Sequence, residues 1–105
     1  MHLQAEVFRA LSDPTRRAVF ERLARGEATV SELTAGFDVS QPAISQHLAA
    51  LRRARLVSER REGRNAYYRA EPTGLKPLVE WIDRYQIFWH ERMDRLKSLL
   101  KELDE

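Results

Sequence analysis

The segment from Val39 to Leu51 constrains the fold more than any other part of the chain. Ser40 can cap the free N–H groups of a first helical turn, and Pro42 stands where its missing N–H group costs no hydrogen bond. Three apolar side chains then recur at the spacing i, i+4 and i+7, which is typical of one buried helix face: Ile44, Leu48 and Leu51. The segment therefore predicts a short helix with a sharp start and one buried stripe.

The opposite face of this helix carries no charge, although charged residues make up 32% of the chain. Small and amide side chains occupy it: Gln41, Pro42, Ser45, Gln46 and Ala49. A glutamine can pair with N6 and N7 of adenine, and a serine can donate to or accept from either base. The pattern favours a helix that contacts base edges in DNA. The alternative is a polar helix that only packs against a neighbouring element.

The stretch Ser40–Leu48 resembles the recognition helix of the ArsR/SmtB family of winged-helix repressors. The resemblance continues at Leu11–Arg16 and Arg61–Arg64, and it covers the chain in order from Leu3 to Ala70. It implies a mainly α fold with a small β-hairpin (α+β), a winged helix-turn-helix. It also implies a homodimeric repressor in which the first and last helices pair across a two-fold axis and which binds double-stranded DNA.

The apolar spacing predicts a single domain over residues 1–105, with a helix-turn-helix at 31–54. Ahead of the recognition helix it predicts a helix over 3–11, a second helix that Asp13 caps and that stops at Gly26, a brief extended piece at 28–30, and a helix that Ser31 caps. Two short helices, a tight turn and a polar-faced helix make a helix-turn-helix.

Two strands with a turn between them are predicted over residues 57–70, the wing. Gly63 and Asn65 are residue types that tolerate the positive φ that a tight hairpin needs. Arg64 would stand at the tip, where a narrow minor groove attracts arginine. The alternative is a capping hairpin with solvated arginines. Arg55 departs from the resemblance, because family members commonly have glycine there, and it must accept a left-handed or otherwise altered helix end.

Charge is concentrated beside the recognition helix. The net charge is only +2, but residues 52–70 hold seven arginines against two glutamates. Arginine suits bidentate contacts with phosphate and guanine, so this run predicts phosphate binding rather than a merely solvated face. The candidate DNA-binding residues are Thr15, Arg16, Ser40, Gln41, Pro42, Ser45, Gln46, His47, Arg52, Arg53, Arg61 and Arg64. Of these, Gln41, Ser45 and Gln46 are expected to contact base edges.

A long final helix is predicted from residue 75 to residue 103, with apolar residues seven apart. Its stripe is longer and more aromatic than a small core needs, which favours pairing with a second chain. The candidate dimer-interface residues are Leu3, Val7, Trp81, Ile82, Tyr85, Phe88, Trp89, Met93, Leu96, Leu99, Leu100 and Leu103. The alternatives are a stripe that covers its own domain and an aromatic pocket for a small ligand.

The sequence gives little support for a metal sensor, an enzyme or a cofactor-binding protein. The chain has no cysteine, so it has no thiolate site. The family's final-helix metal site uses two histidines with Asp and Glu, but Tyr85, Asp94 and Lys97 stand where the two histidines and the Glu would be. No catalytic motif is present. Without a signal peptide or an 18-residue apolar run, a cytoplasmic protein is expected.

Three hypotheses follow. The first is a homodimeric transcriptional repressor that binds an inverted-repeat operator and does not respond to metals. The second is a winged-helix module that binds another protein through its aromatic final helix and does not touch DNA. The third is a repressor gated by an unknown small effector bound near four aromatic residues: Trp81, Tyr85, Phe88 and Trp89.

Overall fold

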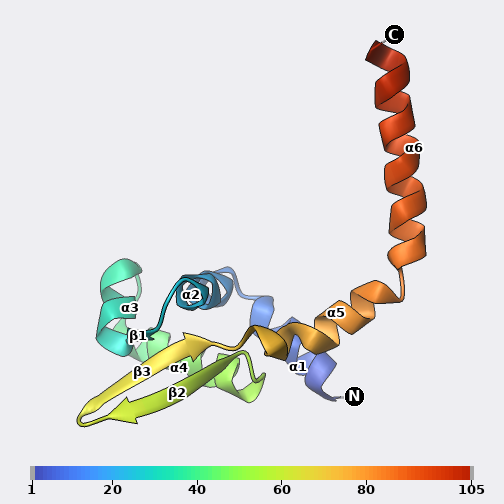
Figure 1. Cartoon of the computed structure of the whole chain (residues 1–105). Coiled ribbons are helices and arrows are strands. Elements are labelled where there is room, and N and C mark those ends of the chain that lie inside the picture. The colour runs from blue at the N-terminus through green and yellow to red at the C-terminus, as the bar shows by residue number, and fades with distance from the viewer. Residues whose placement is uncertain (1, 105) are drawn as a thin grey trace.

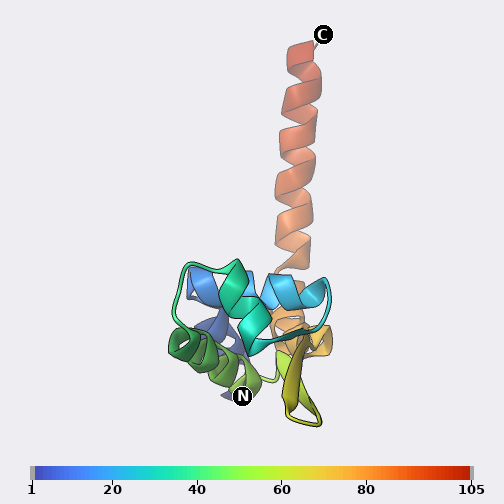
Figure 2. The same cartoon turned by 90° about the vertical axis from the view of Figure 1, so that its left-hand side faces the viewer.

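The computed structural model describes residues 2–104 (Figures 1 and 2). In that range the elements follow in the order α1 (His2–Leu11), α2 (Pro14–Ala24), β1 (Ala28–Thr29), α3 (Val30–Gly36), α4 (Gln41–Arg53), β2 (Val57–Glu62), β3 (Asn65–Ala70), η1 (Pro72–Leu75), α5 (Lys76–Asp83) and α6 (Gln86–Asp104). The fold is mainly helical with one small antiparallel sheet, as the sequence predicts. Helices α3 and α4 form the helix-turn-helix, and the β2–β3 hairpin forms the wing.

The core lies between helices α1 to α4 and the base of the sheet. Its buried apolar residues are Val7, Ala10, Val19, Phe20, Leu23, Ala28, Leu33, Ile44, Leu48, Leu51, Ala54, Leu56 and Val57. The predicted stripe on α4 is therefore confirmed. The assignment of Val7 to a dimer interface is wrong, because Val7 is fully buried within its own domain and has no surface left for a second chain.

Side-chain caps fix where three helices begin. The backbone N–H groups of Arg16 and Ala43 donate to the side chains of Asp13 and Ser40, at 3.0 and 3.2 Å, so both predicted caps are confirmed. The predicted cap at Ser31 is wrong, because the cap is Thr29, two residues earlier, and α3 begins at Val30. Thr29 and Glu32 each accept from the other's backbone N–H, a reciprocal capping box that satisfies two N–H groups at once.

The sheet has the order β1–β3–β2, and both pairings are antiparallel. The last pair of the hairpin is Glu62 opposite Asn65, so its loop has only two residues. Gly63 takes a φ of 62°, which the tight turn requires. The predicted hairpin is confirmed, but among the residues that the structure describes, Asn65 does not share the positive φ; it begins β3.

Arg55 ends α4 in the left-handed conformation, with a φ of 63°. Its N–H donates to the carbonyl of Arg52, and the N–H of Leu56 donates to that of Leu51, both at 2.9 Å. This is the Schellman pattern, which usually has glycine at the position that Arg55 occupies. Of the two expected outcomes, a left-handed or an otherwise altered helix end, the structure has the left-handed one. The chain accepts an arginine there because both flanking leucines are buried and hold the turn in place.

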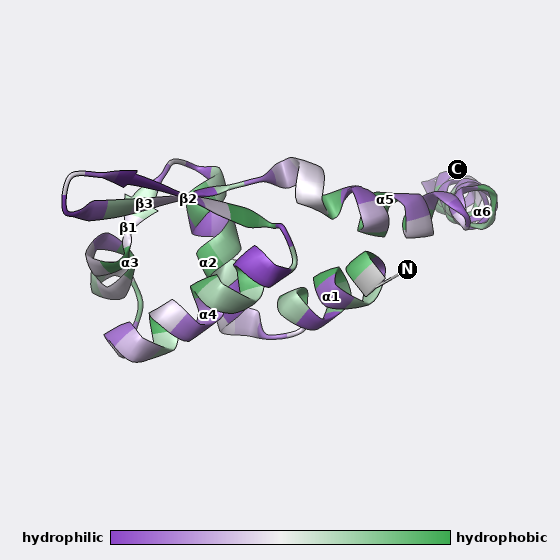
Figure 3. Ribbon diagram, turned by 90° about the horizontal axis from the view of Figure 1, so that it is seen from below, coloured by the Kyte–Doolittle hydropathy of each residue, from purple (hydrophilic) through white to green (hydrophobic). Residues whose placement is uncertain are grey.

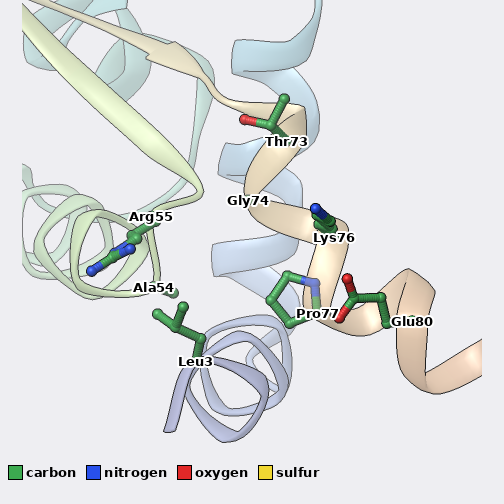
Figure 4. A pocket seen from close by; sticks show the side chains of 8 residues that line it. All are labelled: Leu3, Ala54, Arg55, Thr73, Gly74, Lys76, Pro77 and Glu80. Carbon is green, nitrogen blue, oxygen red and sulfur yellow. The ribbon is translucent and has the colours of Figure 1, made fainter. Parts of the chain in front are cut away.

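Gly74 packs directly against this turn. A Cβ atom on Gly74 would stand 2.1 Å from the carbonyl oxygen of Arg55, far inside van der Waals contact. The close approach brings η1 and the start of α5 beside the end of α4, where they line an open pocket of about 360 Å³ (Figure 4). The side chain of Arg55 points away from Lys76 and Glu80 in this view. Gly74 thus fixes where the C-terminal helices leave the domain.

The single final helix predicted over 75–103 is wrong. A 3-10 turn, η1, precedes α5, and a break at Arg84 and Tyr85 separates α5 from α6. At the break the N–H of Tyr85 donates to the carbonyl of Ile82, three residues back, instead of continuing the four-residue ladder. Helix α5 packs along α1, whereas α6 projects away from the domain (Figure 1), so the molecule measures 62 × 34 × 21 Å.

Replacing Gly74 with alanine tests this packing. The added methyl group would collide with backbone rather than with a flexible side chain, so Gly74→Ala is expected to lower the free energy of unfolding by about 1–3 kcal/mol. Gly36→Ala is the matched control, because its Cβ would meet nothing within 4 Å, and it should be neutral or slightly stabilising. Urea unfolding measures both. Equal effects would contradict the close contact.

Candidate nucleic-acid interface

The outward face of α4 is exposed and uncharged. Gln41, Pro42, Ser45, Gln46 and Ala49 all lie at the surface, while the apolar stripe of the same helix is buried. The Ser40 cap fixes the start of the helix, and the Schellman turn at Arg55 fixes its end. Burial of the apolar stripe holds the helix in one rotation about its axis, so that its amide and hydroxyl groups are directed outward.

A carboxylate links the last turn of α4 to the wing. Glu59, in the middle of β2, accepts from Arg52 Nη1 at 3.2 Å and from Arg61 Nε at 3.0 Å. Tyr68, directly across the hairpin, donates its hydroxyl to the same carboxylate at 2.8 Å. The two predicted phosphate-binding arginines Arg52 and Arg61 thus share one intramolecular anion. The sequence analysis did not single out Glu59. Its i, i+2 spacing to Arg61 places both side chains on one face of the strand, and this spacing could have indicated the ion pair.

The other face of the wing is held by Arg60. Its guanidinium lies 2.7 Å from Glu27, in the loop after α2, and 2.6 Å from Glu62. The same group stacks over the ring of Tyr67, 4.7 Å from the centroid. These contacts attach the hairpin to the domain from the side opposite Glu59. Figure 3 shows that the outer part of the hairpin is strongly hydrophilic, so polar contacts rather than apolar burial orient it.

Three of the candidate arginines form no ion pair among residues 2–104: Arg16, Arg53 at the end of α4, and Arg64 in the turn of the wing. Arg16 bonds to backbone carbonyls instead, whereas the side chains of Arg53 and Arg64 are exposed. Arg53 follows Gln46 by seven positions and Ala49 by four, so it extends the uncharged face of the helix. These two guanidinium groups are therefore free to meet phosphates on either side of that face.

Arg16 supports the structure locally. Its Nη1 donates to the carbonyls of Arg9 and Ala10 at 3.3 Å each, which satisfies carbonyl groups at the end of α1. Its Nε is enclosed without a hydrogen-bond partner among the described residues. A hollow of about 260 Å³ beside it is lined by Glu6, Arg9, Ala10, Arg16, Ala50 and Arg53. The structure therefore brings Arg16 close to Arg53, but with much of its donor capacity already used.

His47 and Thr15 do not join the exposed face. Both are half-buried, and the Nδ1 atom of His47 is enclosed without a partner among the described residues. Its neighbour in space is Asp13 at the start of α2, whose pKa is lowered mainly by the backbone N–H of Arg16 and to a smaller extent by His47. The place of His47 in the helix, one residue before buried Leu48, explains why it does not join the exposed face.

Hydrogen bonds lower the pKa of the carboxylates that hold these elements together. The hydroxyl of Tyr68 is the main cause for Glu59, and the hydroxyl of Ser58 is the main cause for Glu71 at the base of the wing. The backbone N–H of Arg16 lowers the pKa of Asp13 at the start of α2. Each of these carboxylates is therefore ionised at neutral pH, which keeps the wing and α2 in place.

The C-terminal helices expose a long apolar surface. Trp81 packs edge-on against Phe8 of α1, with ring centroids 5.4 Å apart, and lies 5.1 Å from Tyr85. The large exposed apolar residues on α5, on α6 and in the break between them are Val79, Trp81, Ile82, Tyr85, Ile87, Phe88, Trp89, Met93, Leu96, Leu99, Leu100 and Leu103; Leu3 and Phe8 continue the surface on α1. Four aromatic residues line a shallow hollow of about 400 Å³: Trp81, Tyr85, Phe88 and Trp89.

Within residues 2–104, His, Asp and Glu side chains do not gather in groups of three or more that could hold a metal ion. In the same range, every helix is too short or too polar to cross a membrane.

Comparison with known proteins identifies the family. The model of the arsR family of bacterial regulatory proteins matches residues 13–59. The HTH-type transcriptional regulator Rv2034 of Mycobacterium tuberculosis is 49% identical over 93 residues, which cover 89% of this chain and 84% of that protein. The chain belongs to the ArsR family.

The likeness extends to function class and to fold. The transcriptional repressor SdpR of Bacillus subtilis is 38% identical over 76 residues, which cover 72% of this chain and 84% of that protein. An ArsR-like transcriptional regulator from Rhodococcus sp. RHA1 has a solved structure that matches with a TM-score of 0.75 and 34% identity, covering 93% of this chain and 92% of that one. This ArsR-family chain is therefore a winged-helix transcriptional regulator and not an enzyme.

Acid titration of stability tests the carboxylate at the start of α2. Because the folded-state pKa of Asp13 lies below its unfolded value, the stabilisation it provides is complete at neutral pH and is lost as the pH falls through the folded pKa. Asp13→Asn keeps a capping side chain but removes the charge. Urea unfolding should show that the native protein is more stable than this variant at pH 7 and that the difference shrinks as the pH falls below 3.8, the ordinary pKa of the carboxyl group. A gap that stays constant with pH would contradict the assignment.

Proposed function

We propose that this protein is a homodimeric repressor that binds an inverted-repeat DNA operator and does not respond to metals. In this proposal α4 enters the major groove, where Gln41, Ser45 and Gln46 contact base edges. Arg53 binds the phosphate backbone beside α4, and Arg64 reaches the adjacent minor groove. Ser40 contributes a backbone contact at the start of the helix.

The uncharged exposed face of α4, with unpaired arginines at its end and on the wing, carries the proposal. The amide and hydroxyl groups of this face can replace their hydrogen bonds to water with hydrogen bonds to base edges. The face also carries no negative charge that would repel the phosphates. Arg53 and Arg64 supply the positive charge at its margins. Membership of a family of transcriptional regulators supports the same conclusion and argues against an interaction module that does not touch DNA.

The exposed apolar surface of α5 and α6 supports the dimer. A monomer seldom exposes so many contiguous large apolar side chains, and α6 buries none of its residues within its own chain. A dimer formed through this surface would contain two α4 helices, one from each copy. In a two-fold dimer of this kind, the helices enter successive major grooves about 34 Å apart, so the operator would be an imperfect inverted repeat.

The residue types available as metal ligands support a repressor that does not respond to metals. The chain has no cysteine, and Tyr85, Asp94 and Lys97 replace the two histidines and the glutamate expected of a final-helix site. Gating by a small organic effector at the hollow of Trp81, Tyr85, Phe88 and Trp89 stays a separate prediction.

Two substitutions on α4 separate base contacts from phosphate contacts. Gln46→Ala should reduce discrimination at one operator position by about 1–3 kcal/mol, because it removes a base-edge contact. Arg53→Ala should instead weaken binding to all sequences and reduce the salt slope by about one, because it removes a phosphate contact. Footprinting on fragments of the source genome identifies the operator, and gel shifts at several salt concentrations measure both effects.

Arg95→Ala is the control for these variants, because it removes an exposed arginine from α6, far from α4 (Figure 1). It should leave affinity, base preference and salt slope unchanged. If Gln46→Ala and Arg53→Ala altered binding in the same way, the division between base and phosphate contacts would be wrong. If the native protein failed to retard any fragment at low salt, DNA binding itself would be refuted.

A charge in the apolar surface of α6 tests the dimer. Leu96→Glu should shift the protein from dimer to monomer, because the carboxylate would be buried against an apolar partner. Operator affinity should fall by about a hundredfold or more as the two half-sites lose their linkage. Lys97→Glu is the control, because it changes an adjacent residue that is already polar. Analytical ultracentrifugation and gel shifts measure both variants, and a monomeric native protein would contradict the proposal.

A further inference from the structure

Glu59 occupies an unusual place for a carboxylate. It lies in the most arginine-rich part of the chain, yet only 13% of its side chain is exposed, whereas its partners Arg52 and Arg61 are 53% and 73% exposed. Its two oxygens accept from groups on three elements: Arg52 on α4, Arg61 on β2 and Tyr68 on β3. No other side chain among the described residues joins the recognition helix to the wing through an ion pair.

This carboxylate fixes geometry. An arginine side chain is long and has many rotamers, and an exposed one samples most of them. Glu59 holds the guanidinium groups of Arg52 and Arg61 at defined positions between α4 and the wing, and the Tyr68 hydroxyl holds Glu59 in turn. The hairpin has little apolar contact beyond its base, because burial along β2 ends after Val57. Pairing of β3 with β1 and the Arg60–Glu27 ion pair attach the wing to the domain, and this cluster is the ion-paired link that sets its angle to the recognition helix.

The Glu59 carboxylate also reduces the positive charge of the surface between α4 and the wing. Arg52 and Arg61 carry two positive charges, and Glu59 reduces their sum to one. Sequence-independent binding to DNA grows with the number of phosphates that a protein neutralises. Removal of the Glu59 charge would thus strengthen binding to any duplex, while loss of the bridge would misalign the contacts that depend on the operator sequence.

We propose that Glu59 is a positioning residue for DNA specificity: by bridging Arg52 and Arg61 it sets the wing against the recognition helix and suppresses binding to non-operator DNA. The proposal rests on the DNA-binding function proposed above. Glu59 acts through the arginines and does not itself contact DNA. Glu59 therefore affects the ratio of operator affinity to non-operator affinity, and not the affinity alone.

The chain offers a matched control in Glu62. It too is a β2 carboxylate paired with an arginine, but it is 69% exposed, and its partner is Arg60 on the other side of the hairpin. Glu59→Gln and Glu62→Gln change the net charge equally, and both replacements keep the shape of the side chain. Only Glu59→Gln disturbs the link between α4 and the wing. A difference between the two variants therefore measures positioning rather than charge.

The first experiment measures binding to two duplexes: one selected from a randomised library by the native protein, and poly(dI–dC). Glu59→Gln should raise affinity for poly(dI–dC) by about five- to tenfold at ~0.1 M salt and lower the specificity ratio by about tenfold or more. Glu62→Gln should raise both affinities alike and leave the ratio within about twofold. Equal ratios for the two variants would overturn the proposal.

The second experiment needs no DNA and so separates this proposal from the function on which it rests. In the free native protein, NMR relaxation should show the Nε–H group of Arg61 to be ordered. Glu59→Gln should make this group mobile, whereas Glu62→Gln should leave it ordered. Circular dichroism checks that both variants fold. An Arg61 side chain that is equally mobile in all three proteins would refute the positioning role, even if the native protein binds DNA.

Discussion

Burial of three side chains on one face of α4 is the interaction on which the rest of the structure depends. Ile44, Leu48 and Leu51 are at most 1% exposed, and each contributes about 1.5–3 kcal/mol on burial. The caps at the helix start contribute about 1 kcal/mol each, and an exposed ion pair contributes less than that. The apolar stripe therefore decides the rotation of the helix, and through it which of its side chains face outward.

This hierarchy explains what the sequence could predict. Apolar periodicity, capping residues and turn residues act within a few positions of each other, so they predicted α4, its Ser40 cap and the hairpin. The altered helix end at Arg55 was expected only from the resemblance to a family that commonly has glycine there. The pairing of Glu59 with Arg52 depends on how a strand packs against a helix, which no local pattern encodes. The break at Arg84 and Tyr85 was missed for a related reason. No glycine or proline marks it, and the seven-residue spacing of apolar residues continues across it.

Counting arginines overstated the positive surface. Of the seven between residues 52 and 70, four are held by carboxylates: Arg52 and Arg61 by Glu59, Arg60 by Glu27 and Glu62, and Arg69 by Glu71. These pairs shape the wing, whose outer half lacks apolar contacts of its own. The cations left free lie at its tip and at the end of the recognition helix. Composition predicted the chemistry of this surface, but its distribution follows from the tertiary fold.

The C-terminal helix extends the same reasoning to assembly. Helix α6 has 19 residues and buries none of them in its own chain. An isolated helix of this length is only marginally stable in water, because propagation barely offsets the cost of nucleation. Leu103 is 82% exposed and Ile87 is 77% exposed, so a second chain would supply the burial that the first lacks. Formation of α6 and pairing of two recognition helices would then be a single coupled event.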